Sequence, residues 1–151
     1  GTGFTLTVRA DRLDMQADGT LAIYDYKSGS PPTDKEERAF AKQLWIEALM
    51  ARAGAFDGVP AGLQVGRIGY IGLGSRPVFD PVEVDEAALQ QIGEGLVKRL
   101  SHMREATSGF PSRRSVKDTR FAGDYDQLAR HGEWDEAVQP RLIPVGQGGT
   151  P

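Results

Sequence analysis

Two residues of opposite charge, Asp25 and Lys27, stand two positions apart in the segment Leu21-Ala22-Ile23-Tyr24-Asp25-Tyr26-Lys27. The aliphatic and aromatic content of this segment is typical of a β-strand. Because side chains alternate across a strand, Asp25 and Lys27 project from one face. A carboxylate can bind a divalent cation, and a neighbouring ammonium can orient or deprotonate a water on that cation and neutralise a phosphate. The pair therefore predicts hydrolysis of phosphodiester bonds, provided that a second carboxylate joins it.

The second carboxylate comes from the preceding strand, and the hairpin loop decides which one it is. Gly19 lies in a hairpin signal that fits two loop lengths. A two-residue turn pairs Arg12 with Asp25 and leaves Asp14 as the nearest acid. A three-residue loop pairs Asp11 with Asp25, roughly 5 Å apart at their Cβ atoms. We favour the longer loop because Gly19 then occupies the position that requires a positive φ.

Two carboxylates this close repel each other unless a cation lies between them. Their hard oxygens suit Mg²⁺ or Mn²⁺. In the favoured register Asp14 faces away from Asp25, so we expect Asp14 to pair with Arg12 or to lie in solvent. The candidate metal ligands are therefore Asp11 and Asp25.

A helix after the second strand can complete the site. Thr33 and Glu36 have the spacing of a capping box, and the helix is expected to run to about Ala53, before Gly54. Gln43 borders the packing ridge of this helix, so its amide could face the hairpin. The alternative is that Gln43 is an ordinary surface glutamine.

The remaining pattern predicts the elements that carry the site. The first strand is expected at residues 4–15, a third at 64–73, and a short edge strand with two prolines at 77–84. A second helix, capped by its first residue, is expected from Asp85 to about Thr107. Its apolar stripe is expected to be core: Leu89, Ile92, Leu96, Leu100 and Met103.

These elements predict an α/β core at residues 1–107 and an irregular C-terminal extension at 108–151. The extension is expected to pack on the core, with its last residues disordered. The formal net charge is −3, but residues 98–120 hold seven Lys or Arg against two acids. Phosphate contact and an ordinary solvated surface explain this segment equally well. The candidate DNA-binding residues are Arg113, Arg114, Lys117 and Arg120.

The chain has no cysteine, which excludes disulfides and thiolate metal sites. It has no apolar run long enough for a signal peptide or a membrane span. We therefore expect a soluble cytoplasmic protein. Because no methionine begins the chain, we expect it to be a piece of a longer protein.

The order Asp11, then Asp25-Tyr26-Lys27 followed by Ser and Gly, then Gln43 on a helix resembles the PD-(D/E)XK nuclease superfamily. Within it, the pattern is most similar to the RecB-like branch and to AddB-type nuclease domains of AddAB helicase-nucleases. The resemblance implies a restriction-endonuclease-like core, a mixed β-sheet flanked by helices. It also implies that Asp11, Asp25 and the Tyr26 carbonyl hold Mg²⁺ or Mn²⁺, that Lys27 is the catalytic lysine, and that Gln43 supports the site.

The sequence departs from the family in three ways. Many members have a tyrosine four residues after the glutamine, where this chain has Glu47. Many AddB-type domains hold an iron-sulfur cluster through four cysteines. This chain has no cysteine, so no such cluster is expected here. Members usually carry an acidic or histidine ligand on a helix before the first strand, and this chain begins almost at that strand.

The resemblance implies a metal-dependent deoxyribonuclease, expected to be an exonuclease, that cuts unwound DNA in double-strand-break repair and recombination. Its expected partner is an AddA-like helicase-nuclease subunit. The rival hypothesis is an inactive nuclease-fold module that binds DNA ends or a partner subunit. The presence of Asp11, Asp25 and Lys27 together argues against the rival, since a binding module has no need of carboxylates beside DNA. A restriction or CRISPR-associated exonuclease would share the same chemistry.

Overall fold

The computed structural model divides into two compact units, Gly1–Arg99 and Leu100–Pro151. The sheet and the helix that follows its second strand lie in the first unit. The predicted domain boundary at residue 107 stays a prediction. The structure describes residues 3–29, 31–33, 36, 42–109, 125–130, 132–133 and 137.

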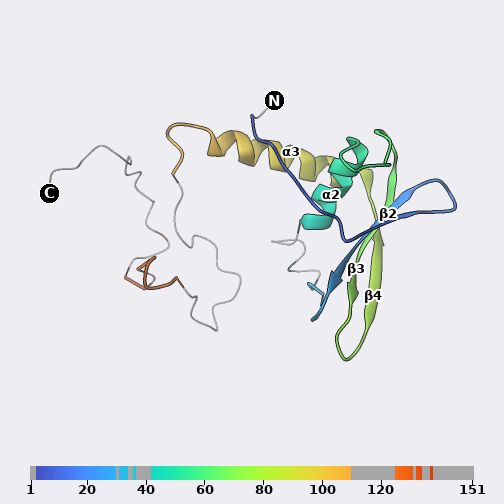
Figure 1. Ribbon diagram of the computed structural model, residues 1–151. Helices are drawn as coiled ribbons and strands as arrows, with labels where there is room; N and C mark the ends of the chain where they lie inside the picture. The colour runs from blue at the N-terminus through green and yellow to red at the C-terminus, as the bar shows by residue number, and fades with distance from the viewer. Residues whose placement is uncertain are drawn as a thin grey trace. The chain divides into compact units, whose positions relative to one another are not determined.

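Within the described residues, four strands form one sheet in the order β1-β2-β3-β4 (Figure 1). The neighbours β1 and β2 are antiparallel, β2 and β3 are parallel, and β3 and β4 are antiparallel. The predicted mixed α/β sheet is thereby confirmed, with β4 at an edge as its prolines indicated. The strands are β1 (Arg12–Met15), β2 (Leu21–Lys27), β3 (Val65–Gly72) and β4 (Val78–Glu83).

The hairpin between β1 and β2 has the three-residue loop. Arg12 pairs with Tyr24, which sets position 11 opposite position 25. The Gln16 N–H donates to the Thr20 carbonyl at 2.8 Å and closes the loop. Gly19 has a φ of 84°, the left-handed conformation that this loop requires. The favoured register is therefore confirmed, and the two-residue turn is excluded.

The first strand is shorter than predicted, because β1 begins at Arg12 and residues 4–11 lie outside it. The Tyr26 N–H, which a longer β1 would pair with its own backbone, donates instead to the Asp11 carboxylate at 3.0 Å. At the point where the pairing of β1 with β2 ends, the Asp11 side chain therefore replaces a backbone carbonyl as the hydrogen-bond acceptor. Alternation alone could not reveal this substitution.

The predicted single helix from Thr33 is wrong in its extent. Thr33 and Glu36 form the expected capping box, with the Thr33 N–H donating to Glu36 Oε2 at 2.9 Å. Helix α2 (Gln43–Arg52), however, begins after Lys42, whose φ of −94° and ψ of 7° depart from the helical values. Residues 34–35 and 37–41 of the predicted helix lie outside the described residues. A capping box specifies where a helix can start and not how far it runs. The end near Gly54, which has a φ of 77°, is as predicted.

Helix α3 (Glu86–Met103) begins as predicted, because Asp85 Oδ2 accepts the Ala88 N–H at 3.0 Å. It ends at Met103 and not near residue 107. Of its apolar stripe only Leu89 is fully buried, so the expectation that the whole stripe is core is wrong. The residues Ile92, Leu96 and Leu100 are half-buried and Met103 is exposed.

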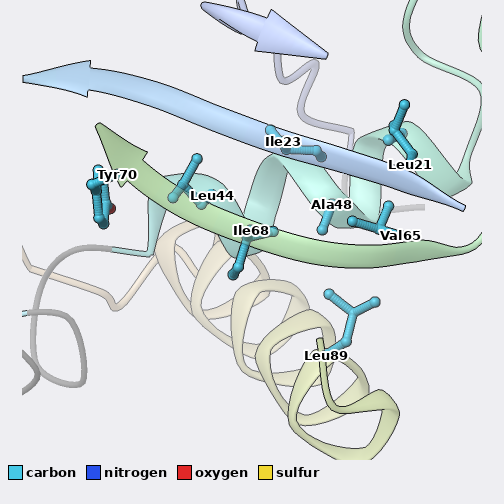
Figure 2. Packing of buried hydrophobic residues seen from close by; sticks show 9 residues of the cluster. Leu21, Ile23, Leu44, Ala48, Val65, Ile68, Tyr70 and Leu89 are labelled. Carbon is cyan, nitrogen blue, oxygen red and sulfur yellow. The ribbon is translucent and has the colours of Figure 1, made fainter. Parts of the chain in front are cut away.

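The core fills the space between the sheet and the two helices (Figure 2). Helix α2 runs behind β2 and β3, and the start of α3 adds Leu89. Each fully buried leucine or isoleucine side chain in this core contributes about 1.5–3 kcal/mol to stability. This packing fixes β2, and hence Asp25 and Lys27, against α2. The core residues are Leu21, Ile23, Leu44, Ala48, Ala51, Val65, Ile68, Tyr70 and Leu89.

Candidate active site

Asp25 is the centre of a polar cluster on the helix-covered face of β2. The residue is 5% exposed, and its Oδ1 accepts a hydrogen bond from Gln43 Nε2 at 3.0 Å. Lys27 Nζ forms an ion pair with Oδ2 at 2.6 Å. Oδ2 nevertheless accepts no well-aligned hydrogen bond from the described residues. This oxygen of Asp25 is therefore held by the ion pair with Lys27 and not by a well-aligned hydrogen bond.

Lys27 lies at the end of β2 with a side chain that is 34% exposed. Its ammonium contacts two groups, the Asp25 carboxylate and the Tyr70 ring, whose centroid is 5.4 Å from Nζ. A cation over an aromatic face is attracted by the ring quadrupole. The two contacts fix the ammonium beside Asp25 and leave part of it open to an incoming anion.

Asp11 lies directly before β1 and faces the same end of β2. Its Oδ2 accepts the Tyr26 N–H at 3.0 Å, so the carboxylate lies against the peptide that joins Asp25 to Tyr26. The structure thus brings Asp11, Asp25, Tyr26 and Lys27 together, as the register predicted. Their catalytic roles stay predictions.

Gln43, the first residue of α2, connects this cluster to the helix. Its Nε2 donates to Asp25 Oδ1 at 3.0 Å and to Glu47 Oε1 at 2.9 Å. Gln43 is exposed, but its amide faces the hairpin as expected. Its role in the site stays a prediction.

Glu47 is the residue that the sequence reasoning did not assign to the site. It is 0% exposed, and its Oε2 has no hydrogen-bond partner among the described residues. Burial raises the pKa of Glu47, although the hydrogen bond from Gln43 opposes this shift. The signal for Glu47 was its i+4 spacing from Gln43, which places both on one helix face.

The donor set fits a small divalent cation. Within the part of the chain that the structure describes, no group of three or more His, Cys, Asp or Glu residues could hold a metal ion. Mg²⁺ does not require such a cage, because it retains several waters and is commonly bound through one or two carboxylates plus substrate phosphates. The carboxylates of Asp11 and Asp25 are of the type that this mode of binding uses. Their role as metal ligands with the Tyr26 carbonyl stays a prediction.

Other candidates lie outside the cluster. Asp14 pairs with Arg12 Nη2 at 2.7 Å on the far face, as expected from the register. His102 Nδ1 lies 3.1 Å from Glu105 Oε2 and its Nε2 lies 3.2 Å from Ser108 Oγ. The contacts link a serine, a histidine and a glutamate, as in the catalytic triad of a hydrolase. The side chains of His102 and Glu105 are 66% and 57% exposed, however, so water competes for both contacts. We interpret them as closing the end of α3.

The predicted DNA-binding residues Arg113, Arg114, Lys117 and Arg120 lie outside the described residues. None of the described helices is long and apolar enough to span a bilayer.

A family model described as the PD-(D/E)XK nuclease superfamily matches residues 1–120. No curated protein and no solved structure matches the chain.

Proposed function

The chain belongs to the PD-(D/E)XK nuclease superfamily, and from this premise we propose that it is a Mg²⁺-dependent nuclease that hydrolyses phosphodiester bonds of DNA. The observation that carries the proposal is the cluster at the end of β2. There the Asp25 carboxylate meets the Lys27 ammonium at 2.6 Å, and Asp11 lies against the adjoining peptide.

Asp11, Asp25 and the Tyr26 carbonyl would hold Mg²⁺ or Mn²⁺. When bound, the cation supplies Lewis acidity at the scissile phosphate and acidifies the attacking water. The protein contributes a rigid placement of the ligands, because the buried Asp25 is fixed from α2 by Gln43.

Lys27 acts on the substrate. Its ammonium has three donors and is already oriented by Asp25 and Tyr70. We assign its remaining donors to the attacking water and to a non-bridging phosphate oxygen, where negative charge increases during attack. Because this ammonium is fixed before the substrate binds, it requires little reorganisation during the reaction.

We further propose that the domain acts as an exonuclease on unwound DNA during double-strand-break repair, beside an AddA-like helicase-nuclease subunit. The support is the Asp-Tyr-Lys-Ser-Gly strand followed by the Gln43 helix, together with the basic segment at 98–120. Arg113, Arg114, Lys117 and Arg120 would contact the DNA backbone.

The test compares Asp25→Asn with Asp14→Asn. Each variant removes one negative charge, but Asp14 lies on the far face and pairs with Arg12. Mg²⁺ binding is measured by calorimetry and degradation of single-stranded DNA on the same samples. We expect Asp25→Asn to lose Mg²⁺ binding and at least about 100-fold in cleavage rate. We expect Asp14→Asn to stay within about twofold of wild type.

Wild-type protein that binds no Mg²⁺ or Mn²⁺ would contradict the proposal. DNA binding without cleavage, unaffected by Asp25→Asn, would favour the rival, an inactive module that binds DNA ends or a partner subunit.

A further inference from the structure

The Gln43 amide bridges two carboxylates. A glutamine side chain has two N–H donors on Nε2 and one acceptor, Oε1. Asp25 Oδ1 takes one donor and Glu47 Oε1 takes the other. The remaining polar atom of the side chain, Oε1, can only accept hydrogen bonds.

The two acceptors also determine which way the amide points. If the amide were rotated by 180°, Oε1 would face two carboxylate oxygens and lose both hydrogen bonds. Asp25 alone provides one acceptor for Nε2, and Glu47 provides the second. The orientation that turns Oε1 away from both acids therefore depends on Glu47 as well as on Asp25.

Stability does not explain why a carboxylate occupies this position. Glu47 is fully buried beside Leu44 and Ala48, and its Oε2 has no hydrogen-bond partner among the described residues. Such a group costs free energy, and an apolar side chain of similar volume would cost less. A local cost of this kind, next to a candidate active site, indicates a role in the site.

We propose that Glu47 is a positioning residue that sets the orientation of the Gln43 amide. In this arrangement Nε2 anchors Asp25, and Oε1 is presented as an acceptor for a water or a substrate group. Glu47 acts through Gln43 and contacts neither metal nor substrate. The catalytic consequence rests on the proposed nuclease function, whereas the orientation of the amide does not.

The test uses two variants at position 47. Glu47→Met keeps the volume and removes the acceptor, while Glu47→Gln keeps a carbonyl acceptor. For each we measure the thermal midpoint, the cleavage rate and the NMR signals of the Gln43 side-chain amide, assigned by their loss in Gln43→Ala. We expect Glu47→Met to match or exceed the wild-type midpoint, to cleave about tenfold more slowly and to shift both amide protons. We expect Glu47→Gln to restore cleavage to within about threefold.

A double-mutant cycle tests whether Glu47 affects cleavage only through Gln43. If Glu47 acts only through Gln43, adding Glu47→Met to Gln43→Ala lowers the cleavage rate no further. An additional tenfold loss in that background would overturn the positioning role. Unchanged amide signals in Glu47→Met would also overturn it. If the wild type fails to cleave DNA at all, the proposed function fails, and shifted Gln43 signals would still support the inference.

Discussion

Glu47 is a buried acid, and within the described part of the chain its Oε2 has no hydrogen-bond partner. This burial affects the stability of the fold. Burial is the main cause that raises its pKa above the ordinary glutamate value of 4.5. Asp25 and Asp11 raise the pKa further by repulsion, whereas the Gln43 hydrogen bond and Lys27 lower it. The net direction is upward.

The raised pKa predicts a pH dependence of stability. An acid with a higher pKa in the folded state binds more protons when folded, so the free energy of unfolding falls as pH rises from about 4.5 through the folded-state pKa. Glu47→Gln removes the ionisable group and with it this pH dependence of the free energy of unfolding. We expect the variant to gain stability relative to wild type across that window. Urea unfolding at several pH values, without divalent cations, measures the difference.

Glu94→Gln is the matched control for Glu47→Gln, because Glu94 is an exposed glutamate on α3 that pairs with Gln90. A stability difference between wild type and Glu47→Gln that stayed constant over the whole pH range would contradict the assignment.

At the scale of elements, the β1–β2 hairpin sets the site because its loop determines which acid faces Asp25. Gly19 has a φ of 84°, and a Cβ there would meet no atom within 4 Å. Gly19→Ala therefore tests backbone conformation alone. We expect a loss of about 1 kcal/mol in the free energy of unfolding, measured by urea denaturation.

Gly95→Ala provides the contrast. Gly95 lies inside α3, and a Cβ there also meets nothing within 4 Å. Alanine is the better helix former, so we expect a gain of about 0.5–1 kcal/mol. Equal effects of the two substitutions would show that the loop does not impose the left-handed conformation at Gly19.

Elements whose chemistry is local were predictable from the sequence. Gly19 specified the hairpin register, and Asp85 specified the start of α3. The start of α2 at Gln43 was not predictable, because no local residue distinguishes Lys42 from a helical position. Nor was the short β1, because its end depends on a contact between the Asp11 side chain and the distant Tyr26 N–H.

The candidate site also contains residues that the sequence pattern could place and one that it could not. Alternation placed Asp25 and Lys27 on one face, and the register added Asp11. Glu47 was noted only as a departure from the tyrosine of the family, because its burial depends on packing against the sheet. A pattern of residue types does not contain that information.

At the scale of the whole molecule, a net charge of −3 hides the basic segment at 98–120. If Arg113, Arg114, Lys117 and Arg120 contact phosphates, replacing all four with Gln weakens binding to single-stranded DNA and flattens its salt dependence. The slope of log affinity against log salt should fall by about 0.7 per contact, about 3 in total. Fluorescence anisotropy in EDTA, where no cleavage occurs, measures this slope.

Arg130→Gln is a control for the loss of a single positive charge, because Arg130 already pairs with Glu133. We expect it to leave the salt slope unchanged. A slope that the fourfold variant also leaves unchanged would favour the solvated-surface interpretation of the segment.

The hydrogen bond from the Tyr26 N–H to Asp11 makes one amide proton of the sheet part of the site. Solvent can exchange this proton only when the carboxylate has left it. Each opening that permits exchange therefore also withdraws a candidate metal ligand. The exchange rate of a single backbone amide thus records how often the site comes apart.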